Sequence, residues 1–103
     1  MSFLNVHPDV LDQRANELEQ ARKHDEELMR QMRTLVMNLD QVWQGESEKA
    51  FVNKFLSRQK DMNEMQTCLK GYIKEAHNAA SEARKLDQAL KKLVNNLLSI
   101  FKR

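Results

Sequence analysis

Hydrophobic side chains recur at helical spacing along the first part of the chain. One row, with steps of seven residues, is interrupted at Asp25, and two further rows lie beside it. The first row is Leu11, Leu18, Met32 and Leu39, the second is Ala21, Leu28, Leu35 and Val42, and the third is Ala15, Met29, Val36 and Trp43. Together they predict a helix from about residue 8 to about residue 43 with one broad apolar face. Such a face is typical of a helix that contacts more than one neighbour.

A second seven-residue pattern runs through the rest of the chain almost without a break. One row is Phe51, Arg58, Met65, Tyr72, Ala79, Leu86, Leu93 and Ile100, and the other is Phe55, Met62, Leu69, Ala76, Ala83, Leu90 and Leu97. Arg58 is the one charged member. Alternating steps of three and four residues over this length are typical of coiled-coil packing, so the pattern predicts a second helix over about 46–100.

Between the two patterns lies the stretch DQVWQGESEKAF, residues 40–51, which contains the chain's only tryptophan and one of its two glycines. We expect Gly45 to end the first helix, because glycine accepts the left-handed backbone of a helix end. Residues 46–48 would then cap the second helix and place acidic groups in its first turn. Trp43, on the last turn of the first helix, would cover the end of the helix pair.

These expectations define an all-α fold: one domain over residues 1–103, built as a hairpin of two long antiparallel helices. At about 1.5 Å per residue, the first helix would be roughly 50 Å long and the second up to roughly 80 Å. One neighbouring helix cannot cover the broad apolar face, and a hairpin of this size has a small core. We therefore expect two hairpins to dimerise into a four-helix bundle. The expected interface residues are Leu18, Leu28, Met32, Leu35 and Leu39.

Two charged residues interrupt the apolar rows, Asp25 in the first helix and Arg58 in the second. A buried unpaired charge is costly, so we expect each to meet a partner. Counted from residue 44, they lie roughly 28 Å and 21 Å along their helices at about 1.5 Å per residue. In an antiparallel dimer whose turns lie about 50 Å apart, Asp25 of one chain is therefore level with Arg58 of the other. The pattern predicts an inter-chain pair that fixes the register of the dimer.

The charge is unevenly distributed along the chain. The totals of 17 basic and 15 acidic residues give a net charge of +2, which does not favour nucleic-acid binding. Residues 1–81 carry 11 basic and 13 acidic residues (11 − 13 = −2), whereas residues 82–103 carry 6 and 2 (6 − 2 = +4). The basic end also has an apolar face, made of Leu90, Leu93, Val94, Leu97, Leu98 and Phe101, with Lys91, Lys92, Lys102 and Arg103 around it.

Three interpretations of this basic end stay open. It is an overhanging helix that packs on its own dimer, or an export or docking segment for which Leu90, Leu93, Leu97 and Phe101 are the candidate residues. The third interpretation, a basic amphipathic helix that binds a membrane surface, is the least favoured.

No catalytic, cofactor or metal site is predicted. A two-helix hairpin offers little room for a convergent polar pocket, and His7, His24 and His77 are not spaced as a metal-binding pair, so we expect solvated histidines. The lone Cys68 excludes an internal disulfide and is expected to be a small filler beside a helix seam. The first ten residues lack the pattern of a cleaved leader, and no run of about 18 apolar residues predicts a membrane span. We expect synthesis in the cytoplasm and, for an exported protein, a route without a cleaved signal peptide.

A Trp-Xaa-Gly turn in the middle of a two-helix chain of this length resembles the WXG family, the ESAT-type proteins of type VII secretion in Gram-positive bacteria. The matching residues are Trp43, Gln44 and Gly45, with the aromatic Phe51 following in the second helix. The resemblance covers the whole chain in length, helix order and turn position. It implies an antiparallel dimer, either of identical chains or with a related small protein. It also implies non-enzymatic, virulence-associated secretion powered by an FtsK/SpoIIIE-type ATPase, as substrate or as export partner for larger toxins.

The family's export signal combines the Trp-Xaa-Gly turn of one chain with a C-terminal Tyr-Xaa-Xaa-Xaa-acidic motif of the other. This chain departs from the second half, because its only tyrosine, Tyr72, is followed by Glu75 one position early and by Ala76 at the expected position of the acid. Two rival functions remain: a cytoplasmic coiled-coil adaptor or regulator, and a membrane-active protein that works through its basic C-terminal helix.

Overall fold

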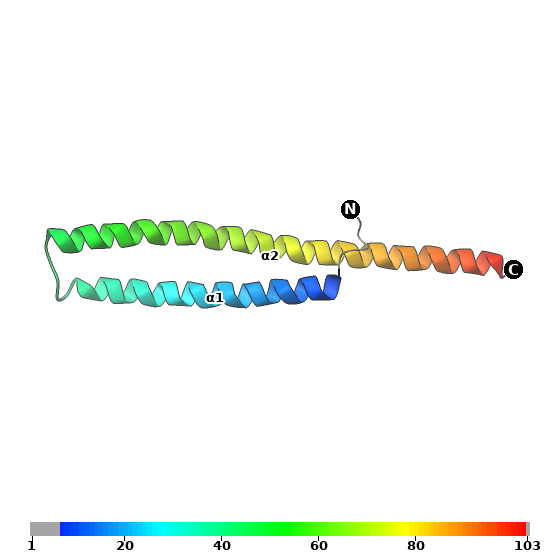
Figure 1. Cartoon of the computed structure of the whole chain (residues 1–103), viewed down its shortest axis with the longest axis horizontal. Helices are drawn as coiled ribbons and strands as arrows, with labels where there is room; N and C mark the ends of the chain where they lie inside the picture. The colour runs from blue at the N-terminus through cyan, green and yellow to red at the C-terminus, as the bar shows by residue number, and fades with distance from the viewer. Residues whose placement is uncertain (1–6, 103) are drawn as a thin grey trace.

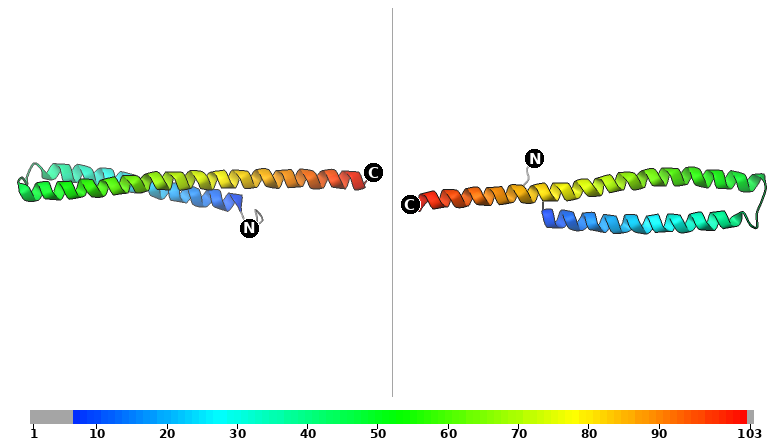
Figure 2. Two further views of the ribbon diagram at one scale, coloured as in Figure 1. Left: turned by 90° about the horizontal axis from the view of Figure 1, so that it is seen from above. Right: turned by 180° about the vertical axis from the view of Figure 1, so that it is seen from behind.

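A computed structural model describes residues 7–102, and over these residues the chain is entirely helical apart from one turn. Helix α1 covers Pro8–Leu39 and helix α2 covers Glu46–Phe101. The two run antiparallel, side by side, as a hairpin that measures 87 × 20 × 14 Å (Figures 1 and 2). The prediction of an all-helical hairpin with two long helices is confirmed, whereas dimerisation stays a prediction. Arg103, counted above with the basic end, lies outside the described residues.

Helix α1 begins as predicted, with Pro8 in its first turn, but it ends at Leu39 rather than near residue 43. The backbone amides of residues 40–42 donate to carbonyl oxygens three residues back, at 3.0–3.3 Å. Such bonds tighten the last turn of a helix and lead the chain away from its axis. The amide of Trp43 closes this turn by donating to the carbonyl of Leu39 at 2.8 Å. The predicted helix end was therefore wrong by four residues.

The seam between the helices is narrow and partly polar. Its buried residues are Ala15, Arg22, Met29 and Val36 from α1, and Glu48, Gln66, Ile73, Ala80 and Ala83 from α2. The third predicted row of α1 therefore faces α2, and the gap that this row left at position 22 is filled by an arginine. Among the described residues no large side chain is fully buried, because two helices share only one line of contact.

One of the two rows predicted for the seam of α2 does not face α1. Phe51, Met65 and Tyr72 are exposed, whereas half-buried Val52 and Gln59 and buried Gln66 lie one position further on and line the seam. The two rows lie about 100° apart on the helix, one on each side of the row of Phe55, so a turn of α2 by about 50° about its axis exchanges them. In the structure, α2 presents Gln66 to Arg22 of α1. The row that contains Phe51 and Tyr72 stays exposed.

Helix α2 is much longer than α1, with 56 residues against 32, so its C-terminal part projects beyond the start of α1 (Figure 1). We call residues 87–101 the overhang. At about 1.5 Å per residue it is roughly 22 Å long. All residues from 87 to 102 are exposed, whereas Ala83 and Leu86 just before them are still buried or half-buried.

Candidate functional site

The turn at the tip of the hairpin depends on a glycine. Gly45 directly precedes α2 and has φ 130° and ψ −171°. This backbone region is open essentially only to glycine. The expectation that Gly45 ends the first helix is wrong, because α1 has already ended and Gly45 begins α2. No side chain caps α2, contrary to expectation, but Glu46 and Glu48 lie in its first turn, near the positive end of the helix dipole.

Trp43 lies in this turn rather than on the last turn of α1, as had been predicted. Its ring packs against that of Phe51, in the second turn of α2, with centroids 5.7 Å apart and planes inclined by 44°. Tilted aromatic pairs at this distance stabilise a contact by about 0.5–1.5 kcal/mol beyond the burial of area. The indole nevertheless keeps 37% of its surface exposed. The turn thus holds the tryptophan against Phe51 and leaves part of it exposed.

A buried carboxylate lies in the first turn of α2. Glu48 is only 7% exposed, and its burial, together with the neighbouring Asp40 carboxylate, raises the pKa of Glu48 above its usual range. The sequence interpretation assigned Glu48 only to the first turn. Its place exactly one seven-residue step before Phe55 is the signal that could have indicated burial.

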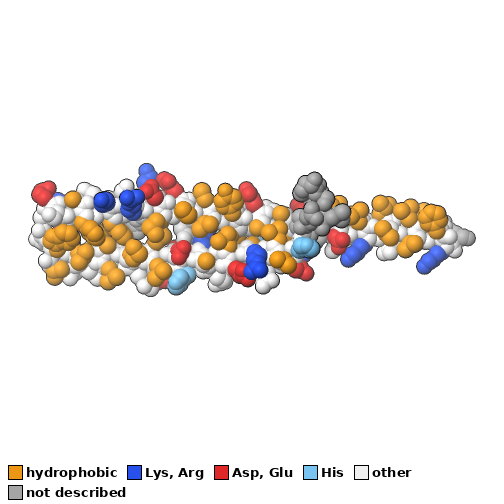
Figure 3. Space-filling model, in the orientation of Figure 1, with side chains coloured by type: hydrophobic (Ala, Val, Ile, Leu, Met, Phe, Trp, Pro, Cys, Tyr) orange, Lys and Arg blue, Asp and Glu red, His pale blue; other side chains and the backbone are white. Residues whose placement is uncertain are grey.

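One side of the hairpin is an apolar face to which both helices contribute. Helical spacing places on this side the exposed residues Leu18, Leu28, Met32 and Leu35 of α1 and Phe51, Met62, Met65 and Tyr72 of α2. Two open grooves of about 270 and 300 Å³ run between the helices there and share Met62 in their walls. Figure 3 shows hydrophobic side chains along this junction. Of the five predicted interface residues, Leu39 is half-buried and the others are exposed, and their role in a dimer stays a prediction.

The two charges that interrupt the apolar rows also lie along these grooves. Asp25 lines the first groove and Arg58 the second. Both are exposed, and neither forms an ion pair within residues 7–102. Both charges are therefore available to a second molecule on this face.

A polar cluster links the two helices near the middle of the seam. Arg22 donates to both oxygens of Glu19 at 2.6 and 2.9 Å, to Glu26 at 3.1 Å and to the Gln66 Oε1 of α2 at 3.0 Å. The Gln66 amide returns a bond to the Arg22 carbonyl at 3.2 Å. The bond to Glu19 is the main cause that raises the pKa of Arg22 above its already high usual value. This cluster was missed, although its arginine stands at a regular step of the third apolar row.

The open end of the hairpin, opposite the turn, is tied by charges. Asp12 accepts a bond from His77 Nδ1 at 2.7 Å and pairs with Arg84 at 2.6 Å, and Arg84 also pairs with Asp9 at 2.8 Å. The bond to His77 and then that to Arg84 lower the pKa of Asp12 below its usual range. His77 is half-buried rather than a solvated histidine as expected. These contacts mark the last point at which α1 holds α2.

Other candidate chemistry does not assemble. Within the described range, no three or more His, Cys, Asp and Glu side chains gather where they could hold a metal ion. Cys68 is exposed, so the expectation that it fills space beside the seam is wrong. Across residues 7–102, neither helix contains a stretch long and apolar enough to cross a membrane.

The geometry defines a class: a two-helix hairpin whose tip is a Trp-Xaa-Gly turn and whose one side is apolar. The family model WXG100, described as "Proteins of 100 residues with WXG", matches residues 4–88, and the chain belongs to this family. Its members are small ESAT-like substrates of type VII secretion and are known as secreted, non-enzymatic proteins. No curated protein and no solved structure matches the chain.

Proposed function

We propose that this chain is a non-enzymatic substrate exported by a type VII secretion system and an export adaptor for partner proteins. Membership of the WXG100 family over residues 4–88 supports this. The observation that carries it is the tip of the hairpin, where a glycine-only backbone at Gly45 holds Trp43 partly exposed. The protein would be made in the cytoplasm of a Gram-positive bacterium and leave without a cleaved signal peptide, driven by the secretion ATPase.

The apolar face supports dimerisation, with a second copy or a related small protein as partner. Soluble monomers rarely expose contiguous apolar patches larger than a few hundred Å², and this face extends from Leu18 to Leu35 along α1. Packing two such faces antiparallel produces a four-helix bundle. Light scattering after size-exclusion chromatography should show about twice the 12.1 kDa chain mass. A wild-type protein that runs as a folded monomer at micromolar concentration would contradict the proposal.

Leu35 provides the sharpest test of that interface, because it is 66% exposed on the apolar face. A charge there has to be buried on association, so Leu35→Glu should weaken the dimer by at least tenfold. Met37→Glu is the matched control, since Met37 is exposed on the other side of α1. Equal weakening by both variants would place the interface elsewhere.

The Asp25–Arg58 pair would set the register of this dimer. Measured from Leu39 and Glu46, where the helices actually end, the two residues lie roughly 21 Å and 18 Å from the turn at about 1.5 Å per residue. They are then level when the two turns lie about 39 Å apart, which is shorter than the roughly 50 Å expected from the sequence. A double-mutant cycle with Asp25→Ala and Arg58→Ala, read out as dimer dissociation, tests the pair. Coupling below about 0.3 kcal/mol would exclude it.

Export is tested by measuring the protein in culture supernatant with and without the secretion ATPase. Trp43→Ala should abolish export while changing the free energy of unfolding by no more than about 1 kcal/mol. Phe51→Ala is the control, because it removes the same ring contact but keeps the indole. Export that persists without the ATPase would favour a cytoplasmic adaptor or another route. A Trp43→Ala protein that unfolds would make the tryptophan a packing residue.

We infer that Tyr72 does not carry the second half of the family's export signal. This residue lies 66% exposed in the part of α2 that runs beside α1, away from the C-terminal end. The overhang, with Leu90, Leu93, Leu97 and Phe101 exposed along it, is then the candidate docking segment at the C-terminal end.

A further inference from the structure

The overhang repeats hydrophobic rows that α1 covers elsewhere. Leu90 and Leu97 continue the row of Ala83, and Val94 and Phe101 lie on the row of Ala80 beyond its interruption at Asp87. Beside the first turns of α1 these rows carry Ala80 and Ala83, which are buried, and nearer the hairpin turn they carry larger side chains such as the buried Ile73. In the overhang they carry large side chains, and all of them are exposed. Side chains of this size, exposed in series on one helix, indicate a docking surface.

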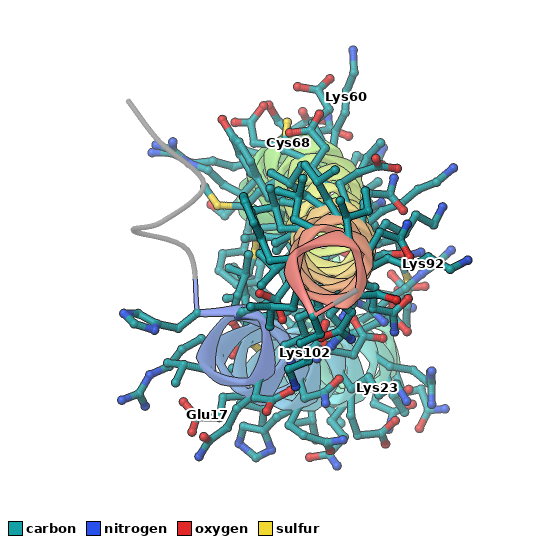
Figure 4. The ribbon with its side chains drawn as sticks, turned by 90° about the vertical axis from the view of Figure 1, so that its right-hand side faces the viewer. Glu17, Lys23, Lys60, Cys68, Lys92 and Lys102 are labelled. Atoms are coloured by element: carbon teal, nitrogen blue, oxygen red, sulfur yellow. The ribbon has the colours of Figure 1, made fainter. Side chains whose placement is uncertain are left out.

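The shape of this surface is that of an amphipathic helix. At about 100° per residue, its apolar side chains occupy an arc of roughly 160°, with Ile100 and Leu98 at the edges. Polar residues and Lys91, Lys92 and Lys102 occupy the rest of the circumference, and no acidic residue lies between Asp87 and residue 102. Figure 3 shows basic side chains along the edge of the apolar row, and Figure 4, viewed from the C-terminal end, shows Lys92 and Lys102 projecting outward.

A second copy of the chain does not cover the overhang in the proposed bundle. The bundle is only as long as α1, roughly 48 Å at about 1.5 Å per residue. In an antiparallel pair each overhang therefore runs past the turn of its partner. The family match also ends at residue 88, so the amphipathic pattern of residues 89–101 belongs to this chain beyond the part that the family describes.

We propose that the overhang docks along an anionic lipid surface. The leucines, Val94 and Phe101 enter the boundary between headgroups and acyl chains, and the lysines stay among the anionic headgroups. Uniform positive charge after Asp87 selects an anionic surface rather than a mixed protein surface, and the wide apolar arc suits a plane better than a narrow seam. This inference does not rest on export, because it concerns the purified chain.

Co-sedimentation of the full-length protein with vesicles tests the proposal. Binding to vesicles of phosphatidylglycerol and phosphatidylcholine should be roughly a hundredfold tighter than to phosphatidylcholine alone, because three lysines each gain about fivefold near an anionic surface. It should also weaken when salt is raised. Absence of binding, or equal binding to both vesicles, overturns the proposal.

Single substitutions locate the contact. Leu97→Gln and Phe101→Gln should each weaken vesicle binding by roughly tenfold or more, since each removes a large apolar side chain from the lipid. Met37→Gln is the control, because Met37 is 41% exposed and Leu97 is 46% exposed. Unchanged binding of the overhang variants, or equal loss in the control, overturns the assignment.

Two further measurements separate lipid from other occupants. Circular dichroism and light scattering of Leu97→Gln should match the wild type, because the residue touches nothing in the hairpin body. A change in oligomeric mass would mean that another copy covers the overhang. If the wild-type protein binds no vesicles and Leu97→Gln nevertheless abolishes export, the overhang docks on a protein partner. Either result overturns docking on lipid.

Discussion

The part of α2 beside α1 and the overhang belong to one continuous helix and share the same hydrophobic rows, yet their surroundings differ. Beside α1 the rows carry Ala76, Ala80 and Ala83, and the short side chains let the two helix backbones approach closely. Beyond α1 the same rows carry leucine, valine and phenylalanine, and they are exposed. Nearer the turn the same rows carry Phe55, Leu69 and Ile73, which are half-buried or buried, so the neighbouring helix and not side-chain size separates the two regions.

Shortening a buried side chain should give the largest difference in stability between the part of α2 beside α1 and the overhang. Ile73 is buried in the seam, so Ile73→Ala should lower the free energy of unfolding by about 2–4 kcal/mol, through lost burial and a cavity. Leu97→Ala in the overhang should change it by less than about 0.5 kcal/mol. Urea unfolding followed by circular dichroism measures both. Similar losses would show that the overhang is packed as tightly as the seam.

Replacing an alanine by a larger residue tests the same two regions by overfilling rather than by removing side-chain volume. Ala80 is 0% exposed, so Ala80→Leu should force the helices apart and cost about 1–3 kcal/mol. Ala89→Leu is its matched control in the overhang and should be neutral or slightly stabilising, because leucine is a good helix former. The same unfolding experiment compares them. A neutral Ala80→Leu would mean that the alanine row does not set the distance between the helices.

The two glycines should respond in opposite directions. Gly45→Ala places a side chain at φ 130° and should destabilise the turn by about 1 kcal/mol or more. Gly71→Ala should stabilise α2 by up to about 1 kcal/mol, because a Cβ there meets no atom within 4 Å. Thermal unfolding of the two variants gives the signs directly. Stabilisation by Gly45→Ala would disprove the positive φ at the turn.

Acid should act oppositely on the two ends of the hairpin. Asp12, at the open end, has a folded-state pKa below its ordinary value of 3.8, so its stabilisation is present above that value and is lost as the pH falls through the lowered pKa. Glu48, at the turn, has a folded-state pKa above its ordinary value of 4.5. Its ionised form therefore destabilises the fold at neutral pH, and stability rises as the pH falls through the raised pKa toward 4.5.

Thermal melts across this pH range separate the two groups. Glu48→Gln should raise the melting temperature at neutral pH and remove the rise in stability on mild acidification. Asp12→Asn should lower the melting temperature at neutral pH and remove the loss in stronger acid. A Glu48→Gln protein that is less stable at neutral pH would show that the carboxylate is stabilising in its ionised form.

The sequence by itself determined the two helices, the Trp-Xaa-Gly turn between them, the charged tail and the family. Each rests on a local cause: seven-residue periodicity, the backbone freedom of glycine, or a run of residue types. The start of α1 at Pro8 followed from the same kind of argument. The exposed state of Trp43 and of the overhang did not follow, because exposure depends on what lies alongside.

Only the tertiary structure decided which row of α2 faces α1. Periodicity identifies the apolar side of a helix, but this side is broad, and contacts across the seam decide the rotation of the helix about its axis that selects the buried rows. Here Arg22 and Gln66 bond to each other across the seam. Neither was a predicted core residue, because a polar group is acceptable in a seam only when its partner is known to be there. That partner lies 44 residues away in the sequence, where no local pattern indicates it.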